Sequence, residues 1–371
     1  MKSFSIYNYI ILFVILIVLG MLYSRFEEKR KRDDTNEDYD AIQKYLLNDS
    51  TLANSEKPIL WIHVPREYNS RNWVSFGSRS SLELNQPYLL LTAKSILTKC
   101  SESFTICIID DDTFQKLIPS WEINMQTISA PILNNFRKFG MMQLLYKYGG
   151  LVCPLSFLCM KDLIGLYEKG TRGDKPFLCE MTNRNVTHTS FDYYPDISFS
   201  GAPRENQTIQ KMIDFWQRTM SSDYTAESEF LGNINRWCNS RIQSGEINKI
   251  NGVDIGTKTI DETPIILDDL MSNNYLNLYT GAYGIYIPAD ELLKRNKYEW
   301  FVRSSTKQVL ESNTIIGNYI LVNLGESANI IESEAPTQNV GFWKVPSDAP
   351  YYGLKPNFLG DNVKQLDHPA R

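Results

Sequence analysis

Three consecutive carboxylates have the clearest potential for chemistry in this 371-residue sequence. Asp110, Asp111 and Asp112 directly follow the apolar run 104–109, which predicts a buried strand. Ligands of α/β sheets bind beyond the carboxyl ends of the strands, where carboxylates could hold a cation or a ribose hydroxyl. Capping of the short helix that follows, by Asp111 or Asp112, is an equally good explanation. Asp110 is the preferred binding residue.

A second group of polar side chains follows the first predicted strand, residues 58–64. Arg66, Arg71 and Arg79 lie in this Ser- and Asn-rich loop, and guanidinium groups can bind a diphosphate bidentately without a metal. Solvated loop charges are the commoner role for such residues. Trp61, within the strand, could stack on a base, although a tryptophan in a buried strand usually belongs to the core.

Two histidines and six carboxylates are the remaining candidates for proton transfer. Neither His63 nor His188 has a partner that the sequence identifies, so both are expected to be structural. The carboxylates that the sequence cannot rank as bases are Glu180, Asp192, Glu227, Glu229, Asp268 and Asp269. A Ser-His-Asp order, a phosphate-binding glycine loop and a metalloprotease helix are not visible.

Hydrophobic periodicity predicts an α/β fold around these residues. A strand at 58–64, a helix at 89–100 and a strand at 104–109 form a βαβ unit, which requires a parallel sheet. A helix at 132–148 follows, and Gly149-Gly150 supplies the left-handed stop before a strand at 151–153. Later helices are expected after Asn206, at 230–242 and at 306–316.

The segments "PILWIHV", "CIIDDDTFQKLIP" and "LLYKYGGLVCPLSF" resemble, in order and rough spacing, the glycosyltransferase-A fold. The closest likeness is to the capsular-polysaccharide-synthesis and DXD sugar-transferase families, which include outer-chain-initiating mannosyltransferases, and it covers about residues 58–165. It implies a Rossmann-like, mostly parallel sheet and a nucleotide-sugar site. The residues that it adds to the site are Tyr148, Gly149 and Gly150.

The sequence departs from these families at the metal site. The two positions of the DXD carboxylates, which hold Mn²⁺ or Mg²⁺ on the diphosphate, are Pro154 and Ser156. Proline has no side-chain ligand and serine is a poor substitute for a carboxylate, so neither ion is expected at the usual site. The preceding helix also carries Arg137-Lys138 and Met141 where the families often have Ser-Asp and Arg.

Two functions remain open. The first is sugar transfer from a UDP- or GDP-linked donor to a glycan or lipid acceptor, with cationic side chains in place of the metal. The second is a catalytically inactive protein of this fold that serves as a binding or structural membrane component. The stretch "YNSRNWVSFGSRSSLELNQPYL" resembles uncharacterised membrane proteins of large DNA viruses, which would make that component part of a virion.

The amino-terminal region predicts a single membrane anchor. Residues 6–23 contain no charge and are long enough to cross a bilayer as a helix, and the charged stretch 24–57 is typical of a stem. The glycosyltransferase-A-like domain is expected at 58–330 and an irregular tail packed on it at 331–371. Lysine and arginine after the span favour a cytosolic body, whereas most anchored sugar transferases face the lumen, so the side of the membrane stays open.

Charge and cysteine content exclude other classes of partner. A formal net charge of −5 provides no broad basic surface for nucleic acid. None of the six cysteines is paired at the two-residue spacing of a zinc or redox motif. Cys107 and Cys153 are expected to be buried free thiols.

Overall fold

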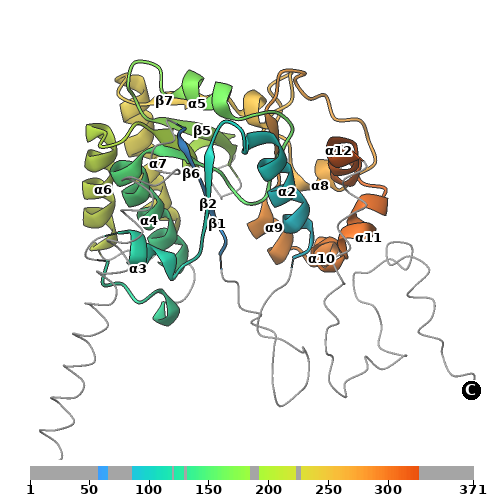
Figure 1. Ribbon diagram of the computed structural model, residues 1–371, viewed down its shortest axis with the longest axis horizontal. Helices are drawn as coiled ribbons and strands as arrows, with labels where there is room; N and C mark the ends of the chain where they lie inside the picture. Colours follow the sequence, from blue (N-terminus) through green and yellow to red (C-terminus); the bar gives the residue numbers. More distant parts are fainter. Residues whose placement is uncertain are drawn as a thin grey trace, which may run out of the picture. The chain divides into compact units, whose positions relative to one another are not determined.

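The computed structural model describes most of the predicted domain (Figure 1). The described residues are 57–65, 86–118, 121–128, 132–183, 192–222 and 227–325. The predicted anchor, the stem up to residue 56, the arginines of the first loop, His188 and the tail lie outside them. Within the described part of the chain, no helix has both the length and the apolar character needed to span a membrane.

The chain divides into two compact units. The main unit contains Lys57–Asp111 and the chain from Ile128 onward, whereas Asp112–Thr127 belongs to the second unit. The described elements of the second unit are helix α3 (Thr113–Leu117) and a 3₁₀ turn at Met125–Thr127.

The predicted βαβ unit is confirmed in the main unit. Strand β1 (Ile59–His63) leads through helix α2 (Tyr88–Cys100) to strand β2 (Thr105–Ile109), and the two strands pair in parallel. The three central side chains of β1 are fully buried, as its unbroken apolar sequence predicts.

The Gly149-Gly150 stop is also confirmed. Helix α4 (Ile132–Tyr148) ends directly before Gly149, whose φ of +70° is the left-handed value that favours glycine. Strand β3 (Gly150–Val152) then pairs in parallel with β1, on the side away from β2. The carboxyl ends of β1, β2 and β3 therefore meet at one edge of the sheet.

The other half of the sheet was not predicted. It contains β6 (Tyr193–Ala202), β5 (Phe177–Thr182) and β7 (Asn248–Ile250), and the strand order is β2-β1-β3-β6-β5-β7. Strand β6 is antiparallel to both of its neighbours, whereas the other three pairings are parallel. The domain is thus α/β, with a mostly parallel, Rossmann-like sheet flanked by helices, as expected.

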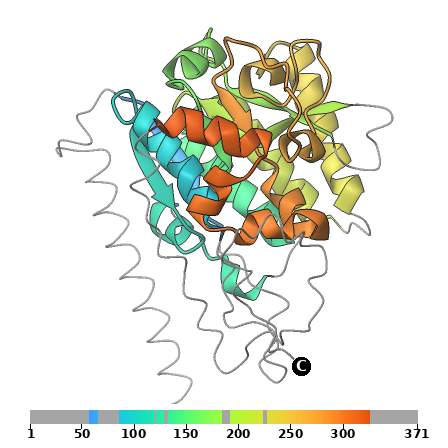
Figure 2. The same ribbon diagram turned by 90° about the vertical axis from the view of Figure 1, so that its right-hand side faces the viewer.

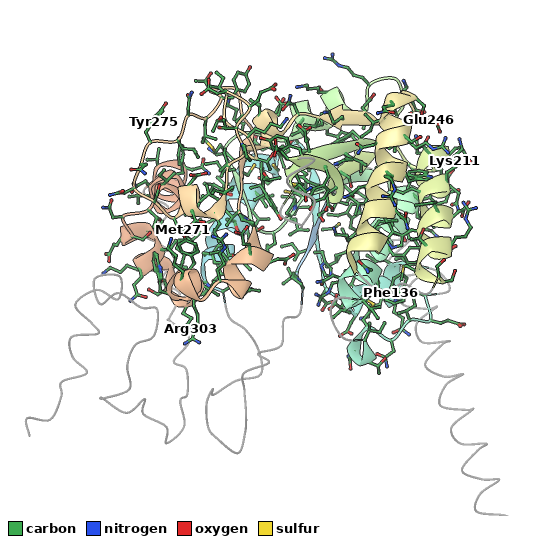
Figure 3. All side chains as sticks on the ribbon, turned by 180° about the vertical axis from the view of Figure 1, so that it is seen from behind. Phe136, Lys211, Glu246, Met271, Tyr275 and Arg303 are labelled. Carbon is green, nitrogen blue, oxygen red and sulfur yellow. The ribbon has the colours of Figure 1, made fainter. Side chains whose placement is uncertain are left out.

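Three helices cover the β6 side of the sheet. Helix α4 packs on β6 and on α6 (Gln207–Met220), and α7 (Glu227–Gln243) packs on α6 and β6, which confirms both later helices. The Asn206 side chain caps α6 by accepting hydrogen bonds from two backbone N–H groups. Lys211 and Arg241 pair with Glu246, which joins α6 to the turn after α7 (Figure 3).

The predicted helix at 306–316 begins at Thr306 as expected but is wrong beyond Glu311, where it ends and a second helix follows (Figure 2). Helix α11 (Thr306–Glu311) and helix α12 (Ile315–Leu324) are separated by a break at Ser312. The Thr314 hydroxyl caps α12 by accepting a hydrogen bond from a backbone N–H group, and this cap starts a new helix. Both helices pack on α2.

Short elements complete the domain. Strands β4 (Phe157–Cys159) and β8 (Gly284–Tyr286) form a separate antiparallel pair against α2. The short helices are α5 (Ile164–Gly170), α8 (Leu267–Leu270), α9 (Ala289–Lys294) and α10 (Glu299–Arg303), with 3₁₀ turns at Gly252–Ile255 and Asn296–Tyr298.

All six cysteines are free thiols. Cys153 is buried, as predicted, whereas Cys107 is only partly buried because the outward face of the edge strand β2 is not fully covered.

Candidate functional site

The carboxyl edge of the sheet gathers polar residues from β1, β2 and β6, together with Pro154 after β3. His63 ends β1, Asp110 and Asp111 follow β2, and Pro154 follows β3. The antiparallel β6 brings Asp196, near its amino end, to the same edge. Because β1, β2 and β3 are parallel, the tip of β3 and the aspartate run share this edge.

A pocket of about 200 Å³ opens at this edge, within the main unit. A single buried water needs roughly 15 Å³, so the pocket has room for a ligand. Its walls come from the ends of β1 and β3, from α4 and β6, and from the segments that begin α2 and α9. The lining residues are His63, Pro65, Gln86, Leu89, Asn134, Arg137, Lys138, Met141, Val152, Cys153, Pro154, Leu155, Ser156, Ile197, Ser198, Tyr286, Ala289, Asp290 and Leu293.

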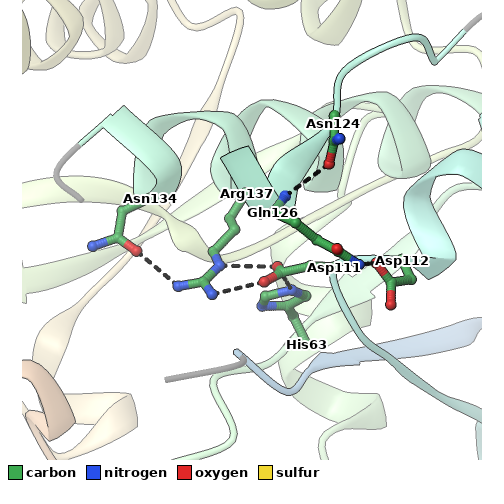
Figure 4. A network of polar contacts seen from close by, with 7 residues as sticks. All are labelled: His63, Asp111, Asp112, Asn124, Gln126, Asn134 and Arg137. Carbon is green, nitrogen blue, oxygen red and sulfur yellow. Dashed lines mark hydrogen bonds and ion pairs between the residues drawn. The ribbon is translucent and has the colours of Figure 1, made fainter. Parts of the chain in front are cut away.

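A buried ion pair between β2 and α4 supports the pocket wall (Figure 4). Arg137 donates two hydrogen bonds to Asp111, from Nε to Oδ1 at 2.9 Å and from Nη2 to Oδ2 at 2.7 Å. Its Nη1 donates to Asn134 Oδ1 at 3.0 Å. Asp111 Oδ1 is also 2.9 Å from His63 Nε2. The carboxylate thus fixes one pocket-lining arginine and one pocket-lining histidine.

The ionisation of Asp111 determines how His63 is protonated. Burial raises the pKa of Asp111, but the hydrogen bonds from His63 and Arg137 and the guanidinium charge outweigh burial and lower it to about 2. An ionised carboxylate only accepts hydrogen bonds, so His63 Nε2 must carry a proton. His63 Nε2 is therefore the donor of its hydrogen bond to Asp111.

The low pKa of Asp111 predicts a loss of stability in acid. Between the ordinary value of 3.8 and about 2, the unfolded carboxyl binds more protons than the folded one. We expect a stabilisation of about 2 kcal/mol that is complete above pH 4 and is lost as the pH falls through 2. Urea unfolding of the wild type and of Asp111→Asn between pH 2 and 6 measures this effect, and equal pH slopes for the two proteins would contradict it.

A second ion pair, between the partly buried Lys138 and the buried Asp196, lies beside the pocket. Lys138 Nζ is 2.9 Å from Asp196 Oδ2, and Asp196 Oδ1 accepts hydrogen bonds from the backbone N–H and the hydroxyl of Ser198. Burial raises the pKa of Asp196, but the Lys138 charge and the Ser198 hydrogen bonds lower it further than burial raises it. Both cations of α4 that line the pocket are therefore paired with carboxylates.

The structure separates the three consecutive aspartates. Asp111 is buried in the ion pair, whereas Asp110, the preferred candidate, is exposed and does not line the pocket. Asp112 belongs to the second unit, where it accepts a hydrogen bond from Gln126 at 3.3 Å. Asp112 occupies the N-cap position of α3, but its side chain accepts no hydrogen bond from the backbone of that helix, so capping by this carboxylate is not observed.

Four of the proposed nucleotide-sugar residues lie in the core. Trp61 is fully buried, its Nε1 donates to Gly149 O at 2.9 Å, and its ring packs on Tyr148. Gly149 precedes β3 and Gly150 is its first residue, at the end of the strand opposite the pocket. The structure therefore gives these four residues a packing role, while Pro154 and Ser156 do line the pocket.

Of the carboxylates proposed as bases, Glu180, Asp192, Asp268 and Asp269 have described side chains, and none of them lines the pocket. Glu180 is buried between Lys258 and Lys249, whose charges and hydrogen bonds lower its pKa although burial raises it. Asp268 pairs with Arg295, and Asp269 accepts a hydrogen bond from the backbone of Ile266. None of these three lines the pocket.

The residues that sequence reasoning missed are the partners of Asp111. His63 and Ile109 are neighbours in the register of β1 and β2, which brings His63 close to the residues just after β2. Arg137 is noticeable in the sequence only as a departure from the DXD families. The parallel pairing of the first two strands was the available signal for the contact between His63 and Asp111.

The pocket does not fit the metal that the glycosyltransferase resemblance implies. Pro154 offers no side-chain ligand, and the nearby carboxylates Asp111 and Asp196 are hydrogen-bonded to cations or hydroxyls. Among the described residues, no group of three His, Cys, Asp or Glu side chains could hold a metal ion.

Comparisons of the chain with protein-family models, with curated proteins and with solved structures found no match.

Proposed function

We propose that this chain is a membrane-anchored, glycosyltransferase-like protein that binds a nucleotide sugar at the carboxyl-edge pocket and transfers the sugar to a glycan or lipid acceptor without a DXD metal. The observation that carries the proposal is the pocket itself. It lies where parallel α/β sheets bind ligands, and Pro154 and Ser156, the positions of the missing carboxylates, form part of its wall.

His63 has the geometry of a general base in such a reaction. Sugar transfer requires removal of a proton from the acceptor hydroxyl, and the His63 imidazole lines the pocket while Asp111 holds its Nε2–H at 2.9 Å. The carboxylate stabilises the imidazolium that forms. Asp111 is then a positioning residue and His63 the catalytic one.

The second candidate, a binding protein without catalysis, is favoured by the charges around the pocket. Arg137 and Lys138 are neutralised by Asp111 and Asp196, which leaves little positive charge for a diphosphate. Arg66, Arg71 and Arg79 would have to supply that charge, and Pro65, the residue before them, lines the pocket.

A ligand panel on the full-length chain in detergent tests both functions. We expect one of UDP-glucose, UDP-N-acetylglucosamine and GDP-mannose to raise the unfolding temperature, and to raise it equally with Mn²⁺ and with EDTA. At a ligand concentration of 100 times Kd, the corresponding stabilisation of the folded state is about 2.7 kcal/mol. A response that requires Mn²⁺ would contradict metal independence. If no nucleotide or nucleotide sugar gives a response, both the proposed nucleotide-sugar donor and the proposed transfer reaction are contradicted.

Release of free sugar from the donor that binds distinguishes transfer from binding alone. We expect slow hydrolysis by the wild type and at least a hundredfold less by His63→Gln, with unchanged donor affinity, because general base catalysis contributes about 10²–10⁴-fold. Donor binding without any turnover, in the presence of glycan and lipid acceptors, would favour the non-catalytic function.

A further inference from the structure

One wall of the pocket presents a buried acceptor that has no partner. Gln86, directly before α2, is 8% exposed and lines the pocket. Within the described part of the chain, its Oε1 accepts no hydrogen bond. A buried polar atom without a partner costs about 1–3 kcal/mol, so native proteins rarely keep one. In a pocket wall, such an atom indicates a ligand that supplies the donor.

Two further oxygen-bearing side chains line the pocket together with Gln86. Asp290, in the first turn of α9, is exposed at the pocket, and Tyr286 at the end of β8 lines it as well. The hydroxyl of Tyr88 is fully buried, also without a hydrogen-bond partner among the described residues. Burial and the nearby Tyr286 and Asp290 raise the pKa of Tyr88, so the hydroxyl stays protonated.

The chemistry of this wall excludes a phosphate and favours hydroxyl groups. Gln86 Oε1 and the Asp290 carboxylate are acceptors, so the group that binds them must donate, and the charge of Asp290 repels an anion. Leu89 and Leu293 line the pocket beside them and offer apolar contact to C–H groups. A sugar ring combines hydroxyl donors with apolar C–H faces.

We propose that Gln86 and Asp290 bind the neutral, hydroxyl-bearing part of the ligand and determine which sugar the pocket accepts. The inference rests on the proposed function for the identity of that ligand. It adds an orientation: the sugar lies toward α2 and α9, and the anionic part lies toward α4 and the end of β1.

The test compares the full-length wild type with Gln86→Leu, which removes the acceptor and keeps the volume, and with Asp290→Ala. Gln210→Leu is the matched control, because Gln210 is on α6, does not line the pocket, and its side-chain amide donates to the neighbouring Asp214 on the same helix. The probes are UDP, GDP, their glucose, mannose and N-acetylglucosamine conjugates, and the free sugars, and the measurement is the Kd from thermal shift or calorimetry.

We expect each pocket variant to raise the Kd of the sugar-containing probes about five- to tenfold, which is the effect of one lost hydrogen bond. The Kd of UDP and of GDP should not change. The Gln210 variant should bind like the wild type. Asp290→Ala decides the result if Gln86→Leu does not fold, because Asp290 is exposed.

Each other outcome is informative. Unchanged sugar binding by both pocket variants overturns this inference and leaves the proposed function standing. If UDP or GDP loses as much affinity as the sugar-containing probes, the proposed orientation is overturned, and the inference with it. Binding of free sugars that depends on Gln86, with no response to any nucleotide, supports the inference and contradicts nucleotide-sugar transfer. Failure of every sugar to bind the wild type overturns the inference, and a response to UDP or GDP alone would still support a nucleotide site.

Discussion

Replacing Arg137 with alanine is expected to lower the free energy of unfolding by about 3–5 kcal/mol, because it leaves the buried Asp111 carboxylate without its main partner. The arginine and aspartate side chains are only 8% and 10% exposed, so both charges are largely removed from water and depend on each other. Loss of the hydrogen bond to Asn134 and of the packing of the arginine stem adds to the effect. Urea unfolding at pH 7 measures the difference from the wild type.

The matched control is Arg204→Ala. Arg204 pairs with Glu205 at 3.7 Å, but both side chains are more than half exposed, so we expect a change within about 0.5 kcal/mol. The pH dependence separates charge from packing. If the cost of Arg137→Ala comes from the unpaired carboxylate, it should shrink as the pH falls from 7 toward 4, since Asp111 then binds a proton. A cost that is independent of pH would mean that packing alone is lost.

Replacing Gly150 with alanine is expected to have the largest effect on folding. Gly150 has a φ of +102°, and an added Cβ would lie 2.2 Å from the carbonyl oxygen of Ile59. This oxygen belongs to β1, which is paired on both sides within the sheet and cannot move away. We expect a loss of about 4 kcal/mol or more, which is exceptional for one methyl group, and therefore little soluble protein.

Gly173→Ala is the control for backbone strain alone. Gly173 also has a positive φ, +74°, but an added Cβ there would meet only the Lys175 side chain, at 3.7 Å. We expect a loss of about 1 kcal/mol, the usual cost of a left-handed alanine. Comparable losses for the two variants, measured by urea unfolding or by the yield of folded protein, would show that close approach to β1 does not explain Gly150.

The sequence determined the first half of the sheet because its signals are local. An unbroken apolar run gave β1, helical spacing gave α2, and Gly149-Gly150 gave the end of α4, which needs a left-handed residue whatever surrounds it. The position of Pro154 at the carboxyl edge followed from these elements, because parallel strands end at the same side. The hydroxyl cap at Thr314 was an equally local signal, and overlooking it produced the wrong helix at 306–316.

Tertiary structure alone decided which of the polar residues meet. Asp110, Asp111 and Asp112 have the same chemistry in sequence, and only the turn after β2 buries one of them against Arg137. The antiparallel β6 brings Asp196 to Lys138. Its residues 196–200 alternate polar and apolar side chains, but this local pattern does not specify its pairing with β3 and β5, which depends on other segments of the chain. Gln86 also became a candidate only in the tertiary structure. Its burial depends on where α2 packs, and the residues next to it in the sequence do not determine that packing.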